Sequence, residues 1–277
     1  MSLLERDLPD AETLSDDLDH AVALAADRLR ALQQPGGWWA GELESNVTMT
    51  AQHVFLLHFL RLLDDDTLRR CANEILARRR ADGTWAIYWG GDPDLAATIE
   101  AYAALRIAGL QADDPRLLPA RRLIEARGGI GASRVFTRLW LALLGIWPWE
   151  EIPQIPVEIV LLPPRAPFSI YDFACWARQT LVALALVMHH RPVRALPPER
   201  ACTELDLGAR RTGGLVGWGD RQLSRFQEAR RQGRRRRALA LAERWLVDRQ
   251  ELDGSWGGIQ PPWVWSLVAL VCCGHGP

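Results

Sequence analysis

The amino-acid sequence predicts an all-α protein in which paired helices form an α/α barrel, or toroid. Three observations lead to this prediction. A short motif with Gly and Trp at fixed spacing recurs after segments that have helical periodicity. Amphipathic segments alternate with nearly apolar ones along the chain. The strict alternation of apolar and polar residues that is typical of β-strands is almost absent. Such helix pairs suit a barrel whose inner ring is the apolar set.

The repeat occurs three times, as a long polar side chain followed by Gly four residues later and Trp six residues later. We expect each Gly to end a helix in the left-handed backbone region, which Gly adopts without strain. We expect each Trp to fold back as a clamp between helices, with its indole N–H offered to a carbonyl. The copies are Gln33-Gln-Pro-Gly-Gly37-Trp-Trp39, Arg79-Arg-Ala-Asp-Gly83-Thr-Trp85 and Gln250-Glu-Leu-Asp-Gly254-Ser-Trp256.

The remaining elements follow along the chain. Apolar residues recur at helical spacing over residues 22–32 and 239–246, directly before the first and third copies. Nearly apolar helices are predicted over residues 47–63, 94–107, 133–146, 171–188 and 262–273. A helix is expected to start at Asp64–Asp66, because carboxylates favour a helix N-terminus. Residues 148–167 carry six prolines and cannot form a regular helix. Residues 191–237 are interpreted as an insertion or long crossover within a single domain, 1–277.

Composition excludes several classes of protein. All 33 basic residues are Arg and the formal net charge is −1, so no overall field favours nucleic acid. The five cysteines show no metal-ligand spacing, and neither a metal nor a cofactor is expected. The acidic N-terminus has no apolar signal region, so a reducing cytoplasm is the default location. No apolar stretch approaches the roughly 20 residues that span a bilayer. Thirteen tryptophans are an unusual excess.

The repeat resembles the QW motif of squalene-hopene and related triterpene cyclases. Further segments are similar to that family, in family order and over nearly the whole chain. They are ESNVTM (44–49), DGTWAIY (82–88), TIEAYAAL (98–105), SRVFTRLWLAL (133–143), IYDFACWAR (170–178) and DGSWGGIQPPW (253–263).

The resemblance implies a class II cyclase, an isomerase that folds squalene or a similar linear triterpene in an apolar cavity between two α/α barrels. An acid in an Asp-x-Asp-Asp motif protonates a terminal double bond, and aromatic faces stabilise the carbocation. By this resemblance Trp176 supports the cation, Ile259, Gln260 and Pro261 form part of the wall, and Phe136 is a weaker cavity candidate. Gln260 belongs to the polar network that holds catalytic water. The family's members are monotopic at the membrane, which implies peripheral contact with its inner face.

The sequence departs from the family in four respects. No acidic cluster reads Asp-x-Asp-Asp, and the family keeps that motif beyond residue 277, so no catalytic residue is assigned. Gln52 stands where the family has an acidic residue. Residues 215–237, with an Arg-rich run, replace an apolar membrane-facing helix. The chain stops where an inner helix should continue, so we expect an N-terminal half, either truncated or one piece of a split enzyme, that is inactive without its C-terminal half.

Two other functions remain open. A free-standing barrel could bind an isoprenoid lipid or pair with a full cyclase as a subunit. A prenyltransferase β-like subunit would share the barrel but needs a zinc site of Asp, Cys and His, and the six histidines form no such group with cysteine. Nucleic-acid binding by the Arg-rich run is disfavoured because aromatic stacking partners are few.

Overall fold

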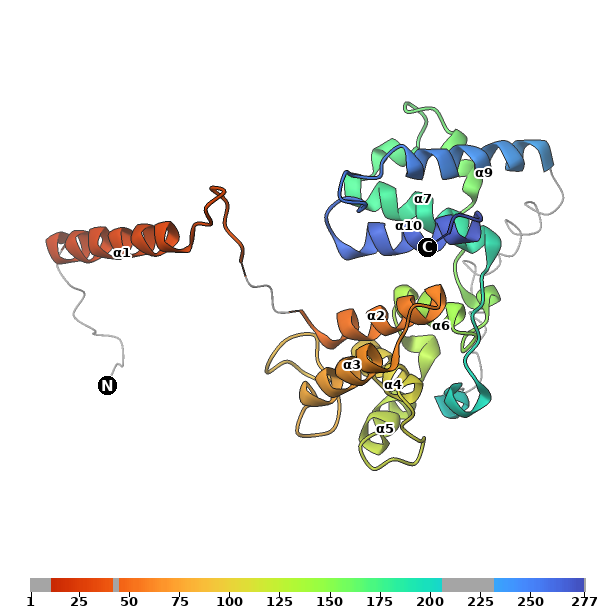
Figure 1. Ribbon diagram of the computed structural model, residues 1–277, viewed down its shortest axis with the longest axis horizontal. Coiled ribbons are helices and arrows are strands. Elements are labelled where there is room, and N and C mark those ends of the chain that lie inside the picture. The colour runs from red at the N-terminus through yellow and green to blue at the C-terminus, as the bar shows by residue number, and fades with distance from the viewer. Residues whose placement is uncertain (1–10, 42–44, 206–231, 277) are drawn as a thin grey trace, which may run out of the picture. The chain divides into compact units, whose positions relative to one another are not determined.

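The computed structural model describes residues 11–41, 45–205 and 232–276. Over these residues all regular elements are helices, which confirms the predicted all-α class. The chain divides into two units, residues 1–44 and 45–277. The first contains α1 (Ala11–Leu32) and the first copy of the repeat, and the second contains the other helices (Figure 1).

In the described part of the second unit, five helices form the inner layer, and they are the ones predicted to be apolar. In α4, every residue from Ala96 to Ile107 is buried. A helix that is apolar around its whole circumference must be covered on all sides, and this explains the inner position. The inner helices are α2 (Val47–Leu60), α4 (Leu95–Ile107), α6 (Val135–Leu143), α7 (Cys175–His190) and α10 (Gln260–Cys272).

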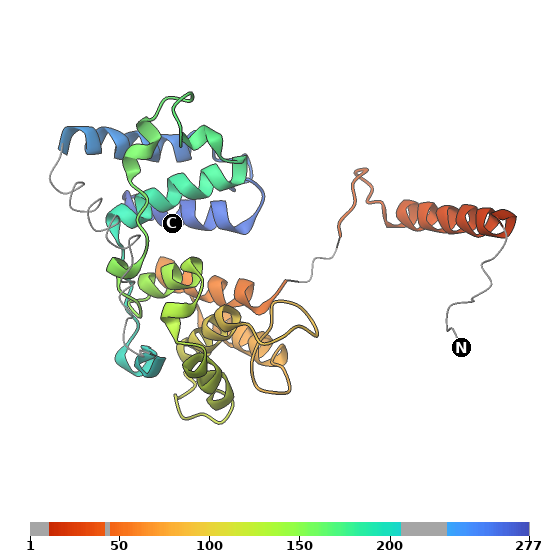
Figure 2. The same cartoon turned by 180° about the vertical axis from the view of Figure 1, so that it is seen from behind.

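Among the described residues, three amphipathic helices form the outer layer, each with one buried stripe. They are α3 (Asp65–Ala77), α5 (Leu118–Ala126) and α9 (Gln232–Val247). α3 packs on α2 and α4, α5 packs on α4, and α9 packs on α7 and α10. Figures 1 and 2 show α9 along α7 in both views. The alternation of inner and outer helices is the helix pairing that the sequence predicted.

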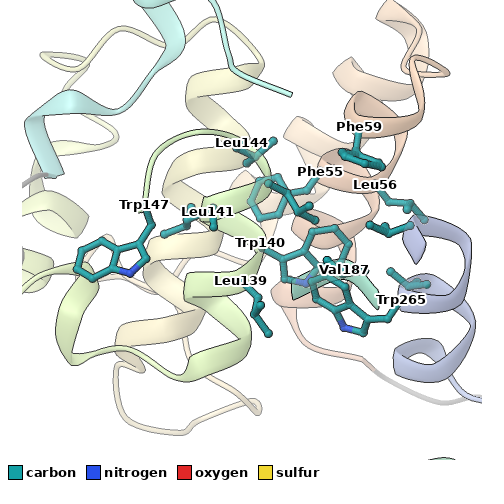
Figure 3. Packing of buried hydrophobic residues seen from close by; sticks show 14 of the residues in the cluster. Phe55, Leu56, Phe59, Leu139, Trp140, Leu141, Leu144, Trp147, Val187 and Trp265 are labelled. Atoms are coloured by element: carbon teal, nitrogen blue, oxygen red, sulfur yellow. The ribbon is translucent and has the colours of Figure 1, made fainter. Parts of the chain in front are cut away.

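Large aromatic side chains fill the centre of the inner layer. The rings of Trp140 (α6) and Trp265 (α10) lie with their centroids 4.8 Å apart, and the ring of Phe55 (α2) lies 6.0 Å from Trp140. Figure 3 shows these three side chains packed together with Leu139 and Val187. Tilted ring pairs at such distances stabilise a fold by more than the burial of their apolar area alone.

The three copies of the repeat share one geometry. In each, the indole N–H donates to the carbonyl ten residues earlier: Trp39 to Leu29 at 2.6 Å, Trp85 to Ile75 at 2.7 Å and Trp256 to Leu246 at 2.8 Å. Trp85 and Trp256 are fully buried, whereas Trp39 is half exposed. The polar residue at the start of the first and third copies donates its Nε2 to the carbonyl of the Gly, from Gln33 to Gly37 and from Gln250 to Gly254.

The position of the glycines differs from the prediction. Gly37, Gly83 and Gly254 do have left-handed backbones, with φ of 83°, 83° and 85°. However, they lie five to seven residues beyond the ends of α1, α3 and α9 rather than at the helix termini. Each instead closes a tight turn, because its N–H donates to the carbonyl three residues earlier. The turn then reverses the chain and brings the Trp back to the helix.

Trp85→Phe is expected to lower the free energy of unfolding by about 2–3 kcal/mol. The change removes a buried hydrogen bond, worth about 1 kcal/mol, and leaves a cavity where the indole packs between α3 and the turn before α4. Urea unfolding followed by far-UV circular dichroism measures it. Trp89→Phe is the control: Trp89 is 92% exposed, and its replacement should cost less than about 0.5 kcal/mol. Equal losses of stability in the two variants would contradict the role of Trp85 as a clamp between helices.

The remaining predictions concern helix ends and loops, and the structure describes most of these. Asp64 caps α3 by accepting the N–H of Thr67 at 2.8 Å, so a helix does begin at the acidic run. The proline-rich segment 148–167 holds only two short 3-10 helices, Trp149–Glu151 and Val157–Leu161. α9 begins at Gln232, inside the Arg-rich run that was assigned to an insertion, while residues 206–231 lie outside the described part.

Candidate functional site

The five inner helices run in the same direction, so their N-terminal ends meet on one side of the second unit. Gln52, six residues into α2, contacts Glu100, six residues into α4. Glu100 also contacts Thr137, near the start of α6. Gln52 contacts Gln260, the first residue of α10. A Cβ at Gly257, just before α10, would meet the side-chain carbonyl of Gln179 in the second turn of α7.

Exposed aromatic side chains concentrate at this same end. In the described part of the second unit, each exposed aromatic residue lies in the first turn of an inner helix or in the loop that leads into one. We call this set, with two aliphatic neighbours, the apolar rim. It consists of Tyr88, Trp89, Phe136, Phe168, Tyr171, Phe173, Trp176, Met49 and Ile259. Several exposed apolar side chains gathered at one end of a domain are typical of a binding face.

Trp176 and Phe136, two of the predicted cavity residues, belong to the rim. Trp176 is the second residue of α7 and is 53% exposed. Phe136 is the second residue of α6 and is 43% exposed, with its ring centroid 6.4 Å from that of Trp265. Both therefore present aromatic surface rather than filling the core. The π-face of an exposed ring attracts positive charge without supplying a lone pair that could react with it.

Ile259, Gln260 and Pro261 form the start of α10. Ile259 is the residue before the helix and is 45% exposed, while Gln260 and Pro261 are half buried. Pro261 suits the first turn because it has no N–H to leave unsatisfied there. The Gly257-Gly258 turn before them has φ of 67° and 63°, and at Gly257 the amide of Gln179 leaves no space for a Cβ. Glycine at this position lets the loop approach α7.

A hydrogen-bonded network links the rim to the interior. Nε2 of Gln260 donates to Oε1 of Gln52 at 2.9 Å, and Nε2 of Gln52 donates to Oε2 of Glu100 at 2.7 Å. The hydroxyl of Thr137 donates to the other oxygen of Glu100. The guanidinium of Arg134 lies 3.9 Å from that oxygen and is half exposed. The network thus joins four helices, α2, α4, α6 and α10.

The electrostatics of this network centre on Glu100, whose side chain is fully buried. Burial raises the pKa of the Glu100 carboxyl above its usual range. The hydrogen bonds from Thr137 and Gln52, and the charge of Arg134, act in the opposite direction, while the charge of Asp94 raises the pKa further. A buried carboxyl that accepts two hydrogen bonds is satisfied, which explains how α4 tolerates it.

Sequence reasoning identified Gln260 and noted Gln52, but it missed Glu100, Thr137 and Arg134. A usable signal existed. Glu100 is the one acidic residue within α4, an otherwise almost wholly apolar helix, and such a residue needs a partner when it is buried. Thr137 and Arg134 lie in the segment 133–143, which was noted for its resemblance but not for these side chains.

The described residues contain no group of three or more His, Cys, Asp or Glu side chains that could hold a metal ion. None of the helices in the described ranges combines the length and apolarity required to cross a bilayer.

The chain matches known proteins over most of its length. A family model described as "Squalene-hopene cyclase N-terminal domain" matches residues 22–277. Squalene–hopene cyclase of Alicyclobacillus acidocaldarius is 45% identical over 272 residues, which cover 95% of this chain and 42% of that protein. Dammaradiene synthase of Dryopteris crassirhizoma is 33% identical over 270 residues, which cover 93% of this chain and 39% of that protein.

A third relative, squalene–hopene cyclase of Zymomonas mobilis, is 40% identical over 181 residues, which cover 65% of this chain and 28% of that protein. The chain thus spans less than half the length of each of these three relatives. The family model matches more than half of this chain, and the first of these relatives is more than 30% identical over nearly all of it. The chain therefore belongs to the squalene-hopene cyclase family and corresponds to its N-terminal domain.

Proposed function

We propose that this chain forms part of the cavity wall of a triterpene cyclase, which cyclises squalene or a similar linear triterpene through carbocations. The apolar rim is the observation that carries the proposal. It gathers exposed aromatic side chains at the common end of five parallel helices, beside the half-buried Gln260. A long hydrocarbon needs such a surface because it offers no polar group for recognition.

Trp176 and Phe136 would stabilise cationic intermediates through their ring faces, at about 0.5–2 kcal/mol for each well-placed ring. Ile259 and Pro261 would exclude water, which keeps the cation from being quenched early. Gln260 would offer the wall's polar group, at the place where the reaction must end by loss of a proton or by addition of water.

The proton that starts the reaction would come from an acid outside residues 1–277. The sequence contains no Asp-x-Asp-Asp motif. Glu100 is unsuited to this step, because burial raises the pKa of its carboxyl and so makes it a weaker acid. We therefore expect the chain by itself to leave squalene unchanged, and a C-terminal half to be the partner that completes the cavity.

The test is a chimera in which this chain replaces the matching N-terminal part of the Alicyclobacillus acidocaldarius cyclase. We expect the chimera to form cyclised triterpene from squalene, measured by gas chromatography and mass spectrometry. Trp176→Ala in the chimera should lower the rate about tenfold, since a cation–π contact of about 1–2 kcal/mol is lost. The matched control is Leu241→Ala, an exposed apolar residue on the outer helix α9, which should leave the rate unchanged.

Two results would count against the proposal. One is a chimera that folds, as judged by gel filtration and circular dichroism, yet forms no cyclised product. The other is cyclised product from the 277-residue chain alone. If the chain binds squalene saturably but the folded chimera stays inactive, the alternative function, a non-catalytic barrel for isoprenoid lipids, would replace the first.

A peripheral contact with the membrane is part of the same proposal. Squalene resides in lipid, so an enzyme that takes it up would bind at a bilayer surface. Arg234, Arg236 and Arg237 in the first turns of α9 are exposed and could face anionic headgroups, whereas Arg235 is more buried and pairs with Glu158. Sedimentation with vesicles that contain about a third anionic lipid, compared with neutral vesicles, measures this contact.

A further inference from the structure

The turn that leads into α10 lies directly against the second turn of α7. Figures 1 and 2 show α10 along α7, and the two helices pack on each other. Gly257 and Gly258 form the turn, with φ of 67° and 63°. A Cβ on Gly257 would clash with Oε1 of Gln179, whereas a Cβ on Gly258 would meet no atom within 4 Å. The turn therefore approaches α7 most closely at Gly257.

Gln179 reaches this turn with an amide that is almost completely buried. The residue is 6% exposed and, among the described residues, its Oε1 is buried without a hydrogen-bond partner. A Cβ would replace one of the two Cα hydrogens of Gly257, so the oxygen faces a C–H bond, which is a weak donor. A buried amide oxygen without a good donor lowers stability, and an apolar side chain would avoid that loss. Such exceptions to good packing chemistry concentrate at functional sites.

The contact between Gln179 and Gly257 adjoins two members of the apolar rim. Trp176 lies three residues before Gln179, which places both side chains on the same face of α7. Ile259 lies two residues after Gly257, at the end of the turn. Both rim residues are about half exposed. The distance between the turn and α7 therefore also affects the spacing between these two rim side chains.

The rest of the turn leaves this distance open. Trp256, just before the turn, is fully buried and donates its indole N–H to the carbonyl of Leu246 at 2.8 Å. The N–H of Gly257 donates to Oε1 of Glu251 at 2.7 Å, but this hydrogen bond is exposed to solvent. Two successive glycines do not define a backbone position by themselves, because glycine adopts many conformations. Gln179 thus supplies a buried restraint on the turn.

We propose that Gln179 is a positioning residue that fixes the Gly257–Gly258 turn against α7 and thereby sets the spacing between Trp176 and Ile259 in the rim. The small oxygen of the flat amide allows the turn to approach more closely than a methyl group would. A wall of fixed shape restricts a long hydrocarbon to fewer folded conformations. The inference rests on the proposed function for the identity of that hydrocarbon, a linear triterpene, whereas the position of the turn is a property of this chain.

A double-mutant cycle in the 277-residue chain tests the position of the turn. Gly257→Ala should lower the equilibrium constant for folding about a hundredfold, because the new Cβ must displace a buried amide and also adopts a positive φ. In a Gln179→Ala background the same change should cost only about tenfold, since only the unfavourable φ remains. Gly258→Ala is the matched control and should cost about tenfold in both backgrounds. Urea unfolding followed by circular dichroism measures each variant.

Each outcome of the cycle decides whether Gln179 holds the turn. If Gly257→Ala costs no more than Gly258→Ala, or costs the same in both backgrounds, the inference is wrong. If Gly257→Ala does not fold at all, recovery of folding on addition of Gln179→Ala supports the inference, and a double variant that also fails to fold overturns it.

The ratio of products formed by the chimera tests the effect on the substrate. Gln179→Ala should raise the share of incompletely cyclised triterpene about twofold, because a less restricted wall lets the cation lose a proton before the last ring closes. Gly254→Ala is the control, since a Cβ there meets only Gln250 at 3.9 Å. Its loss of stability changes the amount of folded enzyme but leaves the product ratio unchanged.

The two proposals fail in different ways. An active chimera whose product ratio does not respond to Gln179→Ala would overturn this inference and leave the proposed function intact. A folded but inactive chimera would overturn the proposed function, and the double-mutant cycle would still decide whether Gln179 positions the turn.

Discussion

Gly83→Ala is expected to destabilise the second unit by about 3 kcal/mol. Gly83 has a φ of 83°, where a residue with a Cβ costs about 1–2 kcal/mol. In addition, the new Cβ would lie 2.7 Å from two ring carbons of Pro119 at the start of α5. A proline ring cannot rotate away, so the turn or α5 must move, and overpacking of this kind costs about 1–3 kcal/mol. Urea unfolding followed by circular dichroism measures the loss.

The third copy of the repeat supplies the matched control. Gly254 has nearly the same φ, 85°, but the nearest atom to a Cβ there is Nε2 of Gln250 at 3.9 Å. Gly254→Ala should therefore lower the free energy of unfolding only by the cost of a left-handed backbone for Ala, about 1–2 kcal/mol. A larger loss for Gly83→Ala shows that the second turn also positions the following helix pair through Pro119. Equal losses of stability in the two variants would show that contact with Pro119 does not add to the cost of Gly83→Ala.

The fold was predictable because its main signals are local. The inner helices carry apolar residues on every face and the outer helices on one, so the sequence pattern alone distinguishes the two layers. The repeat added a second local signal, since a Trp at a fixed distance after a helix implies a reversing turn. Residues 47–63 and 94–107 were placed within a few residues of α2 and α4.

The errors in the fold came from information that a local pattern does not carry. The glycines were assigned to helix ends, but the helices stop earlier and the left-handed residue belongs to a separate turn. The start of α9 was missed because its first turns, 232–237, are polar and arginine-rich. These first turns have few apolar residues, and the helix is held in place by the buried residues Ala238 and Ala242 further along.

The candidate site was only half predictable. Trp176, Phe136, Ile259 and Gln260 were found through resemblance, and the structure places all four at the N-terminal ends of inner helices. The partners of Gln260 depend on contacts over 208 residues of sequence, from Gln260 to Gln52. No periodicity or spacing encodes such a contact, because the helices that carry the two residues meet only in the folded barrel. The same is true of the contact between Glu100 and Thr137.

Glu204→Ala is expected to lower the free energy of unfolding by about 3–5 kcal/mol, the typical cost of leaving one partner of a buried ion pair alone. Oε1 of Glu204 accepts from Nε of Arg106 at 2.9 Å and from the hydroxyl of Tyr102 at 2.7 Å. The two charged side chains are only 7% and 11% exposed. Burial, and then the hydrogen bond to Glu204, raise the pKa of Tyr102, so its hydroxyl remains protonated and can donate at neutral pH.

The loss should be specific to a buried pair. Glu125→Ala breaks the ion pair with Arg121 on the surface of α5, where both side chains are more than a third exposed, and should cost less than about 0.5 kcal/mol. Replacing both partners with apolar residues, as in Arg106→Met with Glu204→Leu, should recover more than half of the loss, because no unpaired charge is then left inside. Arg106 also donates to the carbonyls of Leu110 and Glu199, so full recovery is not expected. If Glu204→Ala costs no more than Glu125→Ala, the segment 198–205 is not held on α4 by this charge pair.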